Sequence, residues 1–159
     1  MIDSKALKNL NKKLEKIAKK LQRATEKVKD SAVQELVSGA NEIRNTIILG
    51  MQKDEKTGLQ YRRGKNMHTA SAKGEYPAVD RGPLLASIFY NIRESDLEVE
   101  LGNLVGAAPY GGFLEEGTEN MEPRPWLEPS VAEHKDSIVK SVGDVSFDIV
   151  RAPFKEEAD

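Results

Sequence analysis

A seven-residue periodicity near the start of the chain constrains the fold most. Apolar side chains recur there at alternating steps of three and four residues: Leu7, Leu10, Leu14, Ile17, Leu21, Ala24 and Val28. This spacing places them on one narrow stripe of an α-helix, with lysines on the other faces. Because three heptads lie at the lower limit for a coiled coil, the stripe fits either a helix packed on its own domain or a pairing face for a neighbouring subunit.

The stripe changes phase after Val28 and resumes over residues 33–47. Residues 31–34 either form a capping box that opens a second helix, or mark the point where one long helix changes its buried face. We expect helix from about Ser4 to Met51, with a break near Asp30 under the first interpretation. Residues 1–52 are assigned to an N-terminal helical region.

Composition favours a single domain from which part of the chain protrudes. A length of 159 residues suits one domain, and 38% apolar against 31% charged residues indicates a lean core and a charge-rich surface. Residues 1–30 carry ten basic and four acidic side chains, a net charge of +6, which leaves −8 for the remainder. We expect a basic arm on an acidic body, and a part of the chain that either protrudes or packs against a partner.

The sequence lacks cysteine and long apolar segments, which limits the kinds of chemical site and of location that we expect. The sequence has no cysteine, which excludes a disulfide framework, a thiolate nucleophile and a zinc–thiolate site. No segment approaches the ~20 apolar residues of a membrane span, and the first residues lack the apolar run of a signal peptide. We expect a soluble protein that is made in the cytoplasm and has no membrane partner.

The rest of the chain divides into three regions. Residues 53–83 contain six glycines and prolines without a sustained period, so we expect a long flexible loop, either solvated or in contact with a neighbouring subunit or nucleic acid. Residues 84–101 predict two antiparallel strands, residues 110–115 a short helix or strand, and the segment after Pro125 a helix that Pro153 stops. The fold class is α+β: a long N-terminal helix, a small antiparallel β-sheet and a C-terminal helix. Residues 84–152 form its core, and residues 153–159 a charged tail.

Candidate catalytic groups are poorly placed for chemistry. Glu115 and Glu116 are adjacent, so they diverge on a helix or point to opposite faces of a strand, which suits no acid/base pair. His134 has no acid or histidine one helical turn away, which favours a solvated helix position over a metal site, and His68 lies in the long loop. Phosphate-loop and dinucleotide fingerprints are absent. We expect no enzyme, no cofactor and no metal.

The basic arm favours a second class of function. Its cations could neutralise phosphates by counterion release, although no aromatic residues are interleaved with them for base stacking. A nucleic-acid-binding accessory protein that acts through the N-terminal helix is therefore the alternative function. Its binding residues would be Lys12, Lys13, Lys16, Lys19, Lys20 and Arg23.

Residues 115–129, EEGTENMEPRPWLEP, form the most distinctive segment. Its three prolines restrain the backbone, which lowers the entropy cost of docking. Trp126 is a large anchor and Arg124 a five-donor fork, both enriched at protein interfaces. The segment is either a rigid recognition and assembly element or a loop packed on its own core.

Two segments resemble a known family. Residues 110–130 read YGGFLEEGTENMEPRPWLEPS, similar to the family's Glu-aromatic-Gly-Thr, Met-containing spacer and Arg-Pro-Phe-Leu-x-Pro-Ala. Residues 74–88 read GEYPAVDRGPLLASI, similar to Gly-Glu-x-Pro-x-x-Asp-Thr-Gly-x-Leu-x-x-Ser-Ile. Over about residues 60–135 the chain thus resembles the gene-product-ten-like tail-component family of tailed bacteriophages, described as tail-completion or head-tail joining proteins. It departs from the pattern at Arg81, Glu116, Trp126 and Ser130.

The resemblance implies a non-enzymatic virion protein whose copies form a ring, commonly a hexamer, in the neck at the head-tail junction. Its partners would be itself, neighbouring neck, connector and tail proteins, and DNA that passes through the channel without sequence-specific binding.

The matching residues would supply structural and interface contacts: Tyr110, Glu115, Glu116, Gly117, Thr118, Met121, Arg124, Pro125, Trp126 and Pro129. The long loop would add Arg62, Arg63, Pro77, Asp80 and Gly82. We expect Gly117 and Thr118 to form a tight turn, and Arg124 to make charge-assisted hydrogen bonds within or between subunits. Trp126 would be a packed anchor, and Glu116, charged where an aromatic is usual, would face solvent or a basic partner.

Overall fold

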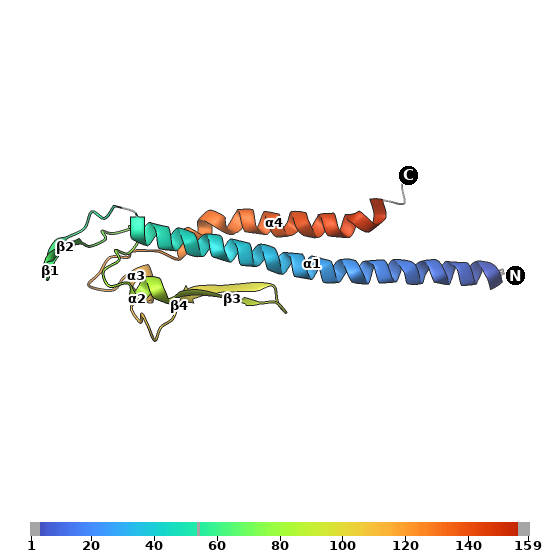
Figure 1. The fold of residues 1–159 in the computed structure, drawn as a ribbon, viewed down its shortest axis with the longest axis horizontal. Coiled ribbons are helices and arrows are strands. Elements are labelled where there is room, and N and C mark those ends of the chain that lie inside the picture. The colour runs from blue at the N-terminus through green and yellow to red at the C-terminus, as the bar shows by residue number, and fades with distance from the viewer. Residues whose placement is uncertain (1–3, 54, 156–159) are drawn as a thin grey trace.

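The computed structural model describes residues 4–53 and 55–155 and has the expected α+β architecture (Figure 1). The fold consists of two long helices that run side by side and of two separate two-stranded antiparallel β-sheets. The elements are α1 (Ser4–Lys53), β1 (Gln60–Arg63), β2 (Asn66–Thr69), α2 (Pro83–Ser87), β3 (Ile88–Arg93), β4 (Glu98–Asn103), α3 (Gly111–Glu116) and α4 (Glu128–Lys155).

Helix α1 is continuous, so the break near Asp30 is absent. No glycine or proline interrupts the helix before Gly39, and lysine, glutamate, leucine and alanine all favour helix. The change of phase after Val28 marks a change of buried face, because Ala32, Ile43 and Ile47 are buried beyond it. At ~1.5 Å per residue the helix is roughly 75 Å long.

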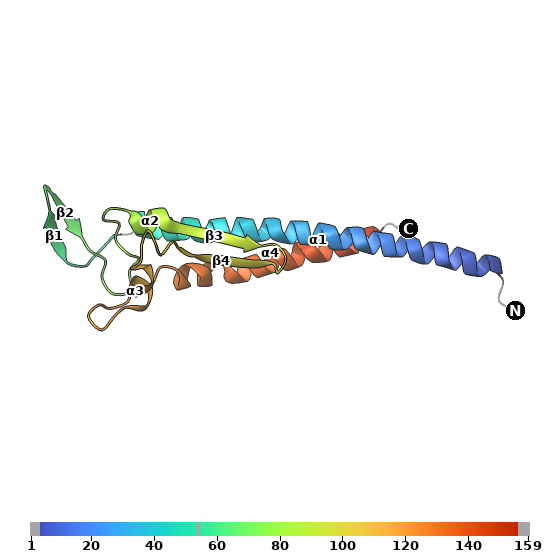
Figure 2. The ribbon, with the colours of Figure 1, turned by 90° about the horizontal axis from the view of Figure 1, so that it is seen from below.

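The core lies around the C-terminal half of α1, between two layers. Helix α4 runs antiparallel along one side of α1, and the hairpin of β3 and β4 lies along the other (Figures 1 and 2). The central buried residues come from α1, α2, β3 and the segments around α3: Ile43, Ile47, Met51, Leu84, Ile88, Ala108 and Trp126.

The two long helices are closely packed at a glycine. A Cβ atom added to Gly39 of α1 would lie 2.5 Å from both Cγ1 and Cδ1 of Ile138 in α4. Ile138 therefore occupies the space that a side chain at position 39 would need. The expected apolar side of the last helix is correspondingly half-buried: Val131, Ile138, Val142, Val145 and Ile149.

The hairpin predicted within residues 84–101 is confirmed. Its register pairs Ile88 with Asn103 and Arg93 with Glu98, and the last pair also forms an ion pair at 2.7 Å. Arg44 of α1 donates to the backbone carbonyl oxygen of Ile88 at 3.3 Å. The sheet thus lies against α1, which gives this hairpin the support that an isolated hairpin lacks in water.

Three local expectations were wrong or incomplete. The connection over residues 53–83 contains the β1–β2 hairpin, which sequence periodicity missed because each strand has four residues, most of them exposed. Helix α2 was not foreseen either. Helix α4 runs past Pro153 to Lys155, so this proline lies in the last turn of the helix and does not end it. Residues 156–159 of the charged tail lie outside the described residues.

The N-terminal part of α1 projects beyond both layers (Figures 1 and 2). We call residues 4–21 the stem. Its apolar stripe is 41–54% exposed at Leu7, Leu10, Leu14, Ile17 and Leu21. Packing on its own domain is therefore the wrong interpretation for this part of the stripe, and it holds only where Ala24 is buried and Val28 half-buried.

Substitution of one glycine in each of the two long helices should separate the effect of close packing from that of helix propensity. Gly39→Val forces its side chain into Ile138, so we expect the free energy of unfolding to fall by about 1–3 kcal/mol. Gly143→Val in α4 is the matched control, since nothing lies within 4 Å of an added Cβ there. Its change should stay within about 0.5 kcal/mol. Urea denaturation measures both, and equal effects would contradict the close approach of α1 and α4.

Candidate interface site

The two motif segments, residues 74–88 and 110–130, meet around one cavity. Its volume is about 460 Å³, and its wall is mostly apolar. The two motifs both contribute to the wall, and the β1–β2 hairpin adds Tyr61 and His68. Six residues singled out in the sequence line it: Pro77, Asp80, Gly82, Tyr110, Met121 and Arg124.

The expected tight turn follows α3. Gly117 has φ 80°, a left-handed value that favours glycine, and its N–H donates to the carbonyl oxygen of Phe113 at 2.9 Å. An added Cβ would lie 2.8 Å from the carbonyl oxygen of Met121. Thr118 and Met121 form a two-way backbone pair, with N···O distances of 2.8 and 3.2 Å. Glycine is therefore required at this position for both conformation and space.

Arg124 makes its hydrogen bonds to backbone carbonyl oxygens within the same chain. Its Nε donates to the carbonyl oxygen of Ser71 at 2.8 Å, and its Nη1 donates to that of Glu122 at 2.9 Å. The N–H of Gly74 donates to the carbonyl oxygen of Pro123 at 3.0 Å. These bonds hold the second motif against the segment that leads into the first.

Trp126 is packed in the core, with 2% of its surface exposed. Its indole Nε1 donates to the carbonyl oxygen of Gly111 at 3.1 Å, so the buried polar atom has a partner. The hydroxyl of Ser130 donates to the carbonyl oxygen of Trp126 at 2.7 Å and lies 2.8 Å from the hydroxyl of Tyr76. The tryptophan thus anchors its own subunit.

The two adjacent acids have different environments, and Glu115 is half-buried. Its Oε2 accepts from the N–H groups of Trp126 and Leu127 at 2.7 and 2.9 Å, and its Oε1 accepts from that of Glu128 at 2.8 Å. The carboxylate thereby caps the N-terminus of α4, where unpaired N–H groups and the helix dipole favour negative charge. Glu116 is exposed, and no described residue pairs with it.

Among the loop residues predicted for the interface, Pro77, Asp80 and Gly82 line the cavity, whereas Arg62 and Arg63 do not. Arg63 forms an ion pair with Asp80, which links the β1–β2 hairpin to the first motif. Pro77 is buried, and Gly82, at φ 87°, precedes α2. Three further residues lie outside the cavity wall: Arg62, exposed on β1; Pro125, half-buried; and Pro129, exposed in the first turn of α4.

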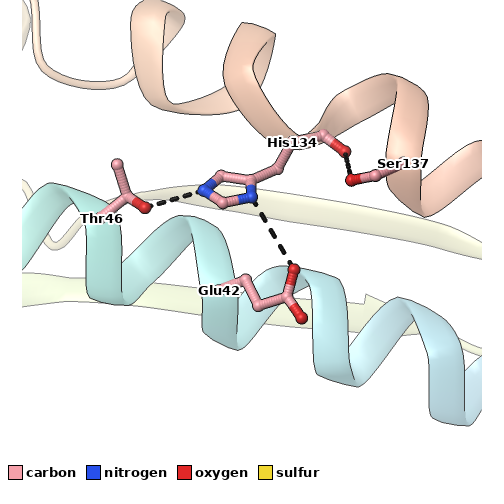
Figure 3. Close-up of polar contacts among 4 residues, drawn as sticks. All are labelled: Glu42, Thr46, His134 and Ser137. Carbon is pink, nitrogen blue, oxygen red and sulfur yellow. Dashed lines mark hydrogen bonds and ion pairs between the residues drawn. The ribbon is translucent and has the colours of Figure 1, made fainter.

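His134 lies between the two long helices, not in solvent (Figure 3). Its Nε2 is 2.7 Å from the hydroxyl of Thr46, and its Nδ1 is 3.7 Å from a carboxylate oxygen of Glu42. Local spacing could not reveal these partners because they belong to α1. Within residues 4–53 and 55–155, no group of three histidine, cysteine, aspartate or glutamate side chains could hold a metal ion.

Sequence reasoning also missed Glu75, which closes the base of the β1–β2 hairpin. Its carboxylate accepts from the hydroxyl of Thr57 at 2.5 Å and from the N–H groups of Thr57 and Ala72 at 3.2 and 2.8 Å. The hydroxyl of Thr57 is the largest cause that lowers the pKa of this carboxyl below its ordinary value, followed by the N–H of Ala72. The β1–β2 hairpin, which forms part of the cavity wall, is therefore held at its base by an ionised glutamate.

Comparisons of the chain with protein-family models, with curated proteins and with solved structures find no match. Among the described helices, none is long and apolar enough to span a membrane.

Replacing Glu75 should loosen the hairpin in a pH-dependent way. Because its folded pKa is lowered, the stabilisation is present above the ordinary value of 4.5 and is lost as the pH falls through the folded pKa. Glu75→Gln should therefore speed amide exchange over residues 57–72 at pH 7, with a smaller difference from the wild type at pH 3. Hydrogen-exchange mass spectrometry measures this, with exposed Glu55→Gln as the control. A difference independent of pH would contradict the role of the carboxylate.

The paired acids provide a second test. Glu115→Gln removes the charge and leaves one carbonyl oxygen to serve three donors, so the free energy of unfolding should fall by about 1–2 kcal/mol. Glu116→Gln, its matched neighbour, should change it by less than about 0.5 kcal/mol. Urea denaturation at pH 7 gives both values. Equal losses would show that the cap contributes little to stability.

Proposed function

We propose that this protein is a structural component of a tailed-phage virion, which forms a ring at the head-tail junction and completes or joins the tail to the head. The observation that best supports this proposal is that the two motif segments with the family resemblance lie together in the structure. They are separate in the sequence, yet the N–H of Gly74 donates to the carbonyl oxygen of Pro123, and the hydroxyl of Tyr76 lies 2.8 Å from that of Ser130. Both segments line one cavity. A motif pair that forms one structural unit favours a shared role over chance similarity.

The exposed apolar surface of the stem favours a protein that assembles with others over one that acts as a monomer. The stem presents five large apolar side chains at about half exposure, and a helix of that kind is stable chiefly when its apolar face is packed. Subunits in a ring meet through different patches on each copy, so a projecting element that reaches a neighbour suits this form of assembly. Six copies and contacts with connector and tail proteins are part of the proposal.

The site suits scaffolding. Both oxygens of Glu115 accept N–H groups, Arg124 binds backbone carbonyl oxygens and Trp126 is enclosed. These groups hold a rigid surface, and we propose that they act without turnover. The acidic body beside a basic stem would let DNA pass through a ring channel without binding to its wall.

A nucleic-acid-binding accessory protein is the second candidate, because the stem exposes Lys12, Lys13, Lys16 and Lys19. The apolar stripe on the same segment favours a protein partner instead. Retention of the isolated protein on DNA, with log affinity that falls linearly in log salt, would favour this alternative.

The proposed function predicts that the protein is present in purified particles of the phage that encodes it, at several copies per virion. A cryo-electron-microscopy map of the neck should contain a ring of this fold. Loss of the protein should leave filled heads and free tails that do not join. Its absence from purified particles, measured by mass spectrometry, would overturn the proposal.

A further inference from the structure

The stem carries its charge on a definite side of its apolar stripe. With Leu7, Leu14 and Leu21 as the first core position of each heptad, one flank of the stripe holds Lys13 and Lys20. The same positions of the other flank hold the uncharged Asn11 and Ala18. In coiled coils, residues at these flanking positions form the interhelical ion pairs that determine which helices pair.

This pattern disfavours pairing between two stems. In an antiparallel pair the lysine flank would face the lysine flank of the other helix, and like charges repel. In a parallel pair Lys13 would face Ala18, which offers no ion pair. Residues 4–21 carry seven lysines and a single acid, Glu15, a net charge of +6. The stripe therefore fits a partner helix that is apolar along one face and acidic beside it.

A second uncovered stripe lies on the outer side of α4. Val139, Phe147 and Val150 are 64, 63 and 46% exposed, and steps of eight and three residues align them on one face. This face is different from the one that presents Ile138 to α1. Gly143 lies within the stripe and leaves room for a neighbouring helix, with nothing within 4 Å of an added Cβ.

The surroundings of this second stripe are acidic overall. Residues 128–151 carry five acids and three bases, a net charge of −2. Asp136, Asp144 and Asp148 are exposed, with Lys140 and Arg151 among them. The charge is thus opposite in sign to that of the stem. The stem is roughly 27 Å long and residues 132–150 of α4 about as long, so the two stripes also match in length.

The packing of α4 on α1 within one chain also indicates that a helix would cover the stem. Helix α4 covers α1 as far as Ala24, where Ile149 and Ala152 share a groove of about 430 Å³ with Lys20 and Asp30. The stem stripe continues the covered face beyond that groove. A helix is the element that would extend this packing along α1.

We propose that the stem of one copy docks on the outer face of α4 of a second copy, with its leucines on the Val139–Val150 stripe and its lysines beside the aspartates. This inference rests on the proposed function, because it names the contact through which the copies assemble. Donor and acceptor surfaces differ and every copy has both. The contact is therefore head-to-tail and propagates to a ring if the rotation closes, or to a filament if it does not.

Cross-linking of the full-length chain tests the contact directly, because the natural sequence has no cysteine. Leu14→Cys protein and Val139→Cys protein, tagged to differ in size, are mixed and treated with a short bismaleimide. We expect a mixed cross-linked dimer, several-fold more abundant than in a mixture of Leu14→Cys with Glu100→Cys, an exposed control on β4. Circular dichroism confirms that each variant keeps its helix.

Charge reversal provides the matched control. In the Leu14→Cys chain, Lys13→Glu and Lys16→Glu together should reduce the mixed product several-fold. Asp144→Lys and Asp148→Lys in the Val139→Cys partner should restore it. Strong salt should weaken the reaction between the Leu14→Cys and Val139→Cys chains that carry no charge reversal, since screening removes the attraction.

Each other outcome overturns the inference. A product formed only between two Leu14→Cys chains would mean that stems pair with each other. A mixed product no stronger than the Glu100→Cys control would mean that α4 is not the acceptor. The proposed function fails separately: docking by a protein absent from virions would overturn only the neck assignment, whereas virion rings without this cross-link would overturn only the docking.

Discussion

The carboxylate of Glu115 receives three successive backbone N–H groups, and the start of α4 depends on it. Helix ends leave such donors unpaired, and a buried donor without a partner costs stability. By accepting them from α3, Glu115 ties the turn at Gly117 to the first residues of α4. Trp126 then enters the core, and Ile138, three turns further on, meets Gly39. The position of α4 along α1, and hence the length of the uncovered stem, follows from this cap.

The molecule divides into a packed end and a projecting end that share one helix. Around the C-terminal half of α1, large apolar side chains and Trp126 form the core, and Arg124 binds the carbonyl oxygen of Ser71, just before the first motif segment. Towards the N-terminus the same helix carries leucines at about half exposure. The apolar side chains of α1 are thus buried in the core at one end of the helix and exposed at the other.

Charge follows the same division. The stem is basic, whereas the outer side of α4 is acidic overall. The charged residues around the two uncovered apolar stripes are therefore opposite in sign. Opposite charge guides association and apolar area supplies most of the affinity. A head-to-tail contact between copies would use both stripes, and it is compatible with the ring that we propose.

Periodicity in the sequence was sufficient to predict α1, the β3–β4 hairpin and α4, because long amphipathic segments and strict alternation reflect local geometry. It could not predict β1 and β2, whose short exposed strands lack alternation and depend on Glu75, or the path of α4 through Pro153. The turn at Gly117 was foreseen from local chemistry.

The role of Glu115 was hidden, because its three donors lie eleven to thirteen residues away and meet it only after α3 and α4 are placed. The sequence alone thus determined where the apolar stripe of α1 lies, since helical spacing is a local property. Only the tertiary structure decided which part of that stripe is covered, because coverage depends on where a distant helix begins and ends.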